Sequence, residues 1–190
     1  MKNTQIKNMV FTAMFLAVGL VLPFLTGQIK QIGNMLLPMH IPVYLCSFIC
    51  SWKYGVVLGM VLPIMRSAIF HMPVMYPNAV AMAIELATYG LVAGYLYGKS
   101  KYKCIKALYK SMIPAMVIGR VVWGIAQVIL LGAGGKAFTM SAFITSAFIN
   151  AIPGIVLQLV LIPTIMVALG RAKYVPLIKK KPKEKTSSHF

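Results

Sequence analysis

Acidic residues are almost absent from this sequence, which has two Asp or Glu residues against 19 Lys and Arg. The formal net charge is +17, yet only 11% of the 190 residues are charged. A soluble domain carries about 25% charged residues, so this composition all but excludes one. It also argues against a nucleic-acid-binding domain, whose basic residues need a water-soluble fold. A hydrophobic fraction of 59% excludes intrinsic disorder.

Cysteine is scarce as well. Three cysteines are too few for a disulfide scaffold, and no CxxC or Cys/His spacing typical of a metal site is present. Cys46 and Cys50 lie four residues apart in an apolar stretch and Cys104 lies in a basic loop, so we interpret all three as structural thiols. His40 and His71 have no acid or cysteine near them in the sequence. We therefore expect neither a metal nor another cofactor.

Motifs for enzymatic chemistry are also lacking. No GxxxxGK[ST] sequence is present, so this chain is not expected to hydrolyse ATP itself. A membrane metalloprotease needs several His, Asp or Glu ligands within the bilayer, and a serine protease needs a serine beside His or Lys at the same depth. Neither arrangement is evident, and we predict that the protein is not an enzyme.

Long apolar stretches dominate the sequence, whose mean hydropathy is +0.82. A membrane-spanning helix needs about 20 apolar residues, and six such stretches can be identified. They cover approximately residues 8–25, 35–52, 54–70, 78–98, 111–132 and 142–170. We predict an all-α polytopic membrane protein with six transmembrane helices in one domain over residues 1–175. A basic, disordered cytoplasmic tail is predicted over residues 176–190.

The basic residues predict the orientation of these helices. Successive spans cross the membrane in opposite directions, so their ends fall alternately on two sides. Fifteen of the 19 bases lie at span ends on one side, and only Lys30 and Lys136 lie at span ends on the opposite side. Lys and Arg accumulate on the cytoplasmic side of membrane proteins, so both termini are predicted to be cytoplasmic. The tail bases at 179–185 either serve only as this topology signal or also lie against anionic headgroups of the bilayer.

Three charged residues, Arg66, Glu85 and Arg120, fall within predicted spans, where each costs about 2.5–3.5 kcal/mol at a helix centre. They form either a structural ion pair or a polar ligand site that opens outward. Two bases and one acid leave a surplus positive charge, which an anionic ligand group would neutralise, and this slightly favours the ligand site. Snorkelling of Arg66 to the outer headgroups would weaken that argument.

Polar and aromatic residues recur at helical spacing in three consecutive spans. The stripes are Asn78, Met82, Glu85 and Tyr89 in the fourth span, Arg120, Trp123 and Gln127 in the fifth, and Ser146, Asn150 and Gly154 in the sixth. Interhelical hydrogen bonding explains any one stripe, but three stripes at a similar depth predict a small-molecule pocket. We add Tyr76 and His40 to the candidate site because both lie near the same outer face.

Ala13 and Ala17 form an AxxxA stripe on the first span. Small residues at this spacing let another helix approach closely, and nothing else on this span explains them. Three functions stay open from the residues alone: a binding subunit energised by partners, a self-sufficient proton-coupled carrier that uses Glu85, and a membrane scaffold without a ligand. Six spans without an evident repeat favour the binding subunit over the carrier.

The chain resembles the substrate-binding (S) components of energy-coupling factor (ECF) vitamin transporters over about residues 5–175. The resemblance rests on the size and span count, on Ala13 and Ala17, and on an ordered set of short motifs. These are residues 37–43 (LPMHIPV), Lys53-Tyr-Gly55 with Gly59, residues 63–67 (PIMRS), Met72-Pro73, and Glu85-Leu-Ala-Thr-Tyr89-Gly90.

The resemblance implies a vitamin or vitamin precursor bound in the outer half of spans four to six. It also implies that Ala13 and Ala17 dock on a transmembrane coupling subunit, and that two cytoplasmic ATPase subunits of this ABC importer supply the energy in a prokaryotic plasma membrane. The vitamin stays open. A surplus Arg favours pantothenate or folate, whereas Trp123, Tyr76 and Tyr89 equally suit the ring of pyridoxine or riboflavin.

Overall fold

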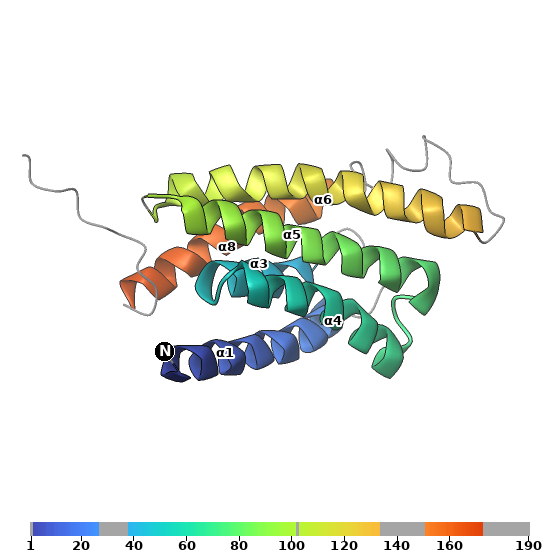
Figure 1. The fold of residues 1–190 in the computed structure, drawn as a ribbon, viewed down its shortest axis with the longest axis horizontal. Helices are drawn as coiled ribbons and strands as arrows, with labels where there is room; N and C mark the ends of the chain where they lie inside the picture. The colour runs from blue at the N-terminus through green and yellow to red at the C-terminus, as the bar shows by residue number, and fades with distance from the viewer. Residues whose placement is uncertain (1, 27–37, 102, 134–150, 173–190) are drawn as a thin grey trace, which may run out of the picture.

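The computed structural model describes residues 2–26, 38–101, 103–133 and 151–172. These residues form helices, with no strand among them (Figure 1). The helices are α1 (Lys2–Val21), the 3-10 helix η1 (Leu22–Thr26), α3 (His40–Ile49), α4 (Trp52–Phe70), the π-helical turn η2 (Met75–Ala79), α5 (Val80–Lys99), α6 (Ile105–Ala133) and α8 (Ile152–Arg171). The all-α prediction is confirmed for this part of the chain.

Five of the described segments are long and apolar enough to cross a membrane. They are Thr4–Phe24, Trp52–Phe70, Met75–Lys99, Ile105–Gly132 and Ile152–Arg171. They overlap five of the six predicted spans, although residues 142–150 of the last predicted span lie outside the described part of the chain. They indicate an integral membrane protein.

The predicted span over residues 35–52 is not confirmed. The described part of it is α3, which has ten residues and rises only about 15 Å, half of a hydrocarbon core of about 30 Å. At its C-terminal end, Ser51 has φ 137° and ψ 161°, which breaks the helix between α3 and α4. The upstream residues 35–37 lie outside the described part of the chain. Six spans are therefore not established.

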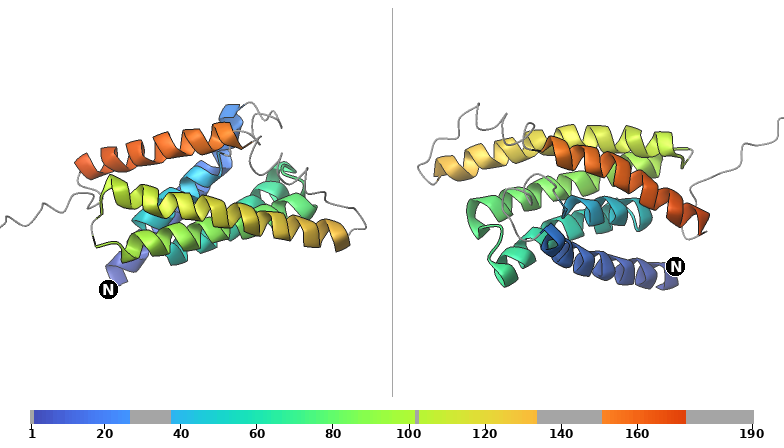
Figure 2. Two further views of the ribbon diagram at one scale, coloured as in Figure 1. Left: turned by 90° about the horizontal axis from the view of Figure 1, so that it is seen from above. Right: turned by 180° about the vertical axis from the view of Figure 1, so that it is seen from behind.

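The helices run lengthwise through one elongated bundle (Figures 1 and 2). α1, α4 and α6 begin at the same end of the bundle, and α5 and α8 finish there (Figure 1). That end carries the described bases of the helix termini and turns, which are Lys7, Lys53, Lys99, Lys101, Lys103, Lys106, Lys110 and Arg171. The charge segregation seen in the sequence is thus a property of one end of the bundle, whereas its assignment to the cytoplasm stays a prediction.

α3 lies at the centre of the bundle and contacts α1, α4, α5 and α8. Every residue of it except Ile49 is buried. A helix that is apolar on all sides is stable only when other helices surround it, and α3 meets this condition. Because α3 begins at His40, its first residue brings a polar side chain into the core.

Glycines bring α4 and α5 into backbone contact. A Cβ atom added to Gly59 would lie 2.5 Å from the backbone of Leu86, and one added to Gly90 would lie 2.5 Å from the backbone of Gly55. Only glycine permits such an approach. The GxxxG pairs Gly55/Gly59 in α4 and Gly90/Gly94 in α5 therefore serve packing within the chain.

Candidate functional site

A buried ion pair joins α5 to α6. Arg120 Nη1 lies 3.2 Å from Glu85 Oε1, and the side chains are only 6% and 2% exposed. Both residues belong to the stripes predicted to form one pocket, and the structure brings them together as the ion pair that the sequence left open. An ion pair this deeply buried must find further hydrogen bonds, because desolvation otherwise exceeds the Coulombic gain.

Two further side chains converge on the same carboxylate. Tyr89 donates a hydrogen bond of 3.0 Å from its hydroxyl to Glu85 Oε1, and His40 Nε2 lies 3.6 Å from that oxygen. The His40 and Tyr89 rings meet edge to face with their centroids 5.0 Å apart, and the ring of Tyr44, which like His40 belongs to α3, lies 5.4 Å from that of Tyr89. We call His40, Tyr44, Glu85, Tyr89 and Arg120 the Glu85 cluster.

Gly119 is a local reason why this cluster fits. A Cβ atom at Gly119 would lie 2.7 Å from Cε1 of Tyr89, so a larger residue would displace the tyrosine ring. The Tyr89 hydroxyl would then lose its position beside Glu85. The residue before Arg120 thus shapes the cluster without contributing a functional group.

Several polar atoms of the Glu85 cluster have no hydrogen-bond partner within the described residues. They are His40 Nδ1, His40 Nε2, Tyr44 Oη and Arg120 Nε. More than about 90% of buried polar groups in proteins are hydrogen-bonded, and an unmade bond costs about 1–3 kcal/mol. His40 Nε2 faces Glu85 Oε1 at 3.6 Å, and the other three atoms are donors and acceptors that a ligand or ordered water would satisfy.

A second polar contact lies farther than the Glu85 cluster from the basic end of the bundle. Gln127 donates a 3.2 Å hydrogen bond from Nε2 to Asn78 Oδ1, and the Gln127 Oε1 atom is buried without a partner in the described chain. Beyond it, the Tyr76 hydroxyl donates to the Leu130 carbonyl. Both contacts tie η2, which precedes α5, to α6.

Two other predicted site residues, Met82 and Trp123, are half-buried on α5 and α6. They belong to the same helical stripes as Glu85 and Arg120. The predicted stripes of α5 and α6 therefore face the same region of the bundle. Asn150 lies outside the described residues, as does Ser146, and of the third stripe only Gly154 is described, as a buried residue of α8.

Arg66 belongs to a different group of residues. Its Nη1 donates a 2.8 Å hydrogen bond to the Leu20 carbonyl, and its guanidinium lies 5.4 Å and 5.5 Å from the ring centroids of Phe24 and Phe70. In the described chain no ion pair or hydrogen bond joins it to Glu85. The surplus charge counted in the sequence is thus held against aromatic faces, and the Glu85 cluster itself contains one acid and one Arg.

Sequence reasoning missed Tyr44 and Gln158. Tyr44 follows His40 by four residues in α3, and Gln158 follows Gly154 by four in α8, so helical spacing was a usable signal for both. Gln158 is 2% exposed and its Nε2 has no partner among the described residues. No group of three or more His, Cys, Asp or Glu that could hold a metal ion occurs in the described ranges.

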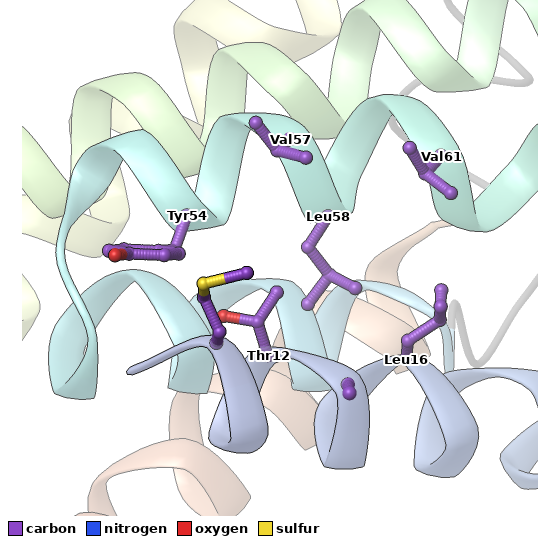
Figure 3. Close-up of a pocket in the computed structure, with 8 residues that line it drawn as sticks. Thr12, Leu16, Tyr54, Val57, Leu58 and Val61 are labelled. Atoms are coloured by element: carbon purple, nitrogen blue, oxygen red, sulfur yellow. The ribbon is translucent and has the colours of Figure 1, made fainter. Parts of the chain in front are cut away.

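The predicted docking residues lie on an open surface. Ala13 and Ala17 are both exposed on α1, and Ala13 lines an apolar groove between α1 and α4 (Figure 3). The groove has a volume of about 420 Å³, and its lining residues are Met9, Thr12, Ala13, Leu16, Tyr54, Val57, Leu58 and Val61. We call it the α1–α4 groove.

Comparison with known proteins identifies the family. No significant match was found among curated proteins or among solved structures. The family model described as "ECF transporter, substrate-specific component" matches residues 7–166. This range contains all the described helices except the first five residues of α1 and the last five of α8. The match spans the Glu85 cluster, the Arg66 contacts and the exposed face of α1, and the chain therefore belongs to the family of substrate-specific components of ECF transporters.

Proposed function

We propose that this chain is the high-affinity binding subunit of an ECF-type ABC importer for a vitamin or vitamin precursor. The observation that carries the proposal is the set of unpartnered buried polar atoms in the Glu85 cluster and at Gln127. A purely structural network would be expected to satisfy its own donors and acceptors. A polar ligand among α3, α5 and α6 would satisfy them instead.

The chemistry of the cluster favours a ligand with both donors and acceptors and with a ring. Arg120 Nε and Gln127 Oε1 offer one donor and one acceptor on the same face of α6, seven residues apart. Tyr44, Tyr89 and Trp123 supply aromatic surface. Because Glu85 already balances Arg120, the surplus-charge argument for pantothenate or folate becomes weaker, and pyridoxine and riboflavin stand beside them as candidates.

Uptake requires partners in this proposal. Ala13 and Ala17 form the surface for a transmembrane coupling subunit, since small exposed side chains allow a partner helix to approach closely. Two cytoplasmic ATPase subunits supply the energy. The location is the plasma membrane of a prokaryotic cell.

The proposal is tested by thermal unfolding of the purified chain with each water-soluble vitamin. A ligand at 100 times its Kd adds about 2.7 kcal/mol to the free energy of unfolding, so one compound should raise the Tm clearly. Tyr44→Phe should reduce that rise while leaving the ligand-free Tm nearly unchanged, because only an unpartnered hydroxyl is removed. Tyr97→Phe is the matched control, since its hydroxyl is also buried without a partner in the described chain but lies at the opposite end of α5.

Two outcomes select the other functions. Uptake by the chain alone in proteoliposomes, driven by a proton gradient, would identify a secondary carrier with Glu85 as the proton site. If no vitamin changes the Tm, the chain is a scaffold without a ligand. A rise in Tm together with uptake that needs partner subunits is the expected result.

A further inference from the structure

α3 contacts α1 through two polar pairs. The Asn8 side chain donates a 3.1 Å hydrogen bond from Nδ2 to the Cys50 carbonyl, at the residue that follows the last one of α3. One turn further along α1, the Thr12 hydroxyl lies 3.6 Å from Cys46 Sγ. The pairs are four residues apart on each helix, so they lie on one face of α1 and on one face of α3.

The same face of α1 packs closely on α3 farther along. A Cβ atom added to Gly19 would lie 3.2 Å from Cγ of Pro42, which precedes Cys46 by four residues. Gly19 is buried, whereas Ala13 and Ala17 are exposed on the opposite side of the helix. The inner face of α1 therefore holds α3, and the outer face stays open to a partner.

The other side of α3 meets α5. His40, Tyr44 and Phe48 recur every four residues, and the centroid of each ring lies 4.9–5.4 Å from that of a tyrosine ring of α5. These tyrosines are Tyr89 for the first two rings and Tyr97 for the third. The residues that contact α1 are offset from this row by two positions, or about 200° around a helix. α3 therefore lies between α1 and α5, with one row of side chains against each (Figure 1).

α3 is short enough to be displaced as one piece. Its ten residues are joined by their own backbone hydrogen bonds, and the helix is interrupted at Ser51, where φ is 137°. α3 and α4 are therefore not one continuous helix. The contacts on the two sides of α3 are linked through about three turns of helix, so a shift of the row that faces α1 also moves the row that faces α5.

We propose that Asn8 and Thr12 are positioning residues of the ligand site and act through α3. Their contacts hold α3 against α5 and so keep His40 and Tyr44 beside Glu85. A partner that displaces α1 therefore withdraws both side chains from the Glu85 cluster and weakens vitamin binding. The effect on the vitamin rests on the proposed function, whereas the link from α1 through α3 does not.

The effect on the vitamin is tested by isothermal titration calorimetry of the full chain, with pyridoxine, riboflavin, pantothenate and folate as the probes. Asn8→Ala and Thr12→Val, each alone, should lower the affinity for the vitamin that binds by about two- to thirtyfold. Thr88→Val is the matched control on α5 and should leave the affinity unchanged. Thr88 is half-buried like Thr12, and both hydroxyls donate to the carbonyl four residues earlier. In the described chain, however, no hydrogen bond joins Thr88 to α3.

A lower affinity in both α1 variants, with the control intact, supports the proposal. A lower Tm with unchanged affinity would show that Asn8 and Thr12 only stabilise the fold, and it would overturn the positioning role. An equal loss of affinity in Thr88→Val would also overturn it. If the natural chain binds none of the four vitamins, that result counts against the proposed function, and the ligand-free experiment decides whether α3 links α1 to the cluster.

The ligand-free experiment uses Cys46, which is fully buried against α1, as the reporter. Alkylation of the full chain by N-ethylmaleimide is followed by peptide mass spectrometry, with the exposed Cys104 as the internal reference. His40→Ala removes a ring that packs on α5. It should speed the alkylation of Cys46 by about two- to tenfold, because the loss of an edge-to-face ring pair makes α3 easier to displace.

Two further variants keep this experiment decisive. Phe48→Leu weakens the same side of α3 at another ring and should act in the same direction, including if His40→Ala does not fold. Tyr109→Ala removes a ring whose hydroxyl ties α6 to the Leu159 carbonyl of α8, and it should leave Cys46 as unreactive as in the natural chain. An unchanged rate at Cys46 in the α3 variants, or an equal rise in Tyr109→Ala, would overturn the link.

Discussion

α1 and α5 have the same length, 20 residues each, but they occupy opposite environments. In the segment Met75–Lys99, which contains α5, 56% of the most apolar stretch of 18 residues is buried inside the bundle. The corresponding share for Thr4–Phe24, which contains most of α1, is 17%. α5 carries Glu85 and Tyr89 into the core, whereas α1 turns Met9, Met14 and Val18 outward. The comparison shows a buried polar helix and an exposed apolar one; on the proposed function, ligand binding and partner docking are therefore separated within this small protein. Substitutions along α5 should change stability and binding, and those on the open face of α1 should change only what docks there.

The largest effect is expected from breaking the ion pair of the α5 region. Glu85→Gln or Arg120→Met alone leaves an uncompensated buried group, which costs about 3–5 kcal/mol of the free energy of unfolding. The double variant should recover part of this loss, because neither charge is then unpaired. Chemical denaturation in detergent measures all three.

The same double variant separates a structural pair from a ligand site. If it folds and no longer responds to the vitamin that stabilises the natural chain, the Glu85 cluster binds the ligand. A double variant that folds and keeps the full ligand-induced rise in Tm would show that the pair only joins α5 to α6.

The next largest effect is expected at the contact of α5 with α4. Gly90→Ala inserts a Cβ atom against the backbone of Gly55, and such overpacking costs about 1–3 kcal/mol. Gly98→Ala is the matched control on the same helix, since nothing lies within 4 Å of a Cβ atom there. The control should be neutral or stabilising by up to about 1 kcal/mol, because alanine favours a helix. Equal Tm values for the two variants would contradict the close packing.

A smaller effect is expected at Arg66 of α4, which contacts the end of α1 and the η1 helix that follows it. Arg66→Lys keeps the charge but loses the planar group that lies near Phe24 and Phe70 and bonds the Leu20 carbonyl. We expect a loss of about 1 kcal/mol in stability. The ligand-induced rise in Tm should not change. Loss of that rise with a normal ligand-free Tm would return Arg66 to the ligand site.

The smallest effect on stability is expected on α1. Ala13→Trp with Ala17→Trp changes two exposed residues, so the free energy of unfolding should stay within about 0.5 kcal/mol. Vitamin binding should persist, but uptake in cells that contain the partner subunits should be lost. Val117→Trp with Val121→Trp makes an equally spaced pair on the exposed face of α6 and should leave uptake intact. Lost binding in the α1 variant would contradict the docking role.

Sequence periodicity was sufficient to predict five of the helices and the inward stripes of α5 and α6. Spacing identifies the face of a helix on which Glu85, Tyr89 and Arg120 lie, but not which helices those faces meet. The contact of His40 with Glu85 depends on α3 lying in the centre of the bundle, and the contacts of Arg66 depend on where α1 ends. Neither follows from local pattern. The break at Ser51 was also hidden, because a serine at φ 137° has no distinctive sequence signal.

The glycine contacts of α4 with α5 also limit how a ligand can enter. Where backbone atoms of Gly59 and Gly90 interlock with those of the facing helix, the two helices cannot shear past one another without first separating. We therefore expect α4 and α5 to move as one unit, with Glu85 fixed to it. If a ligand binds at the Glu85 cluster, as proposed, its path is expected to open by displacement of α3, α6 or α8 relative to that unit.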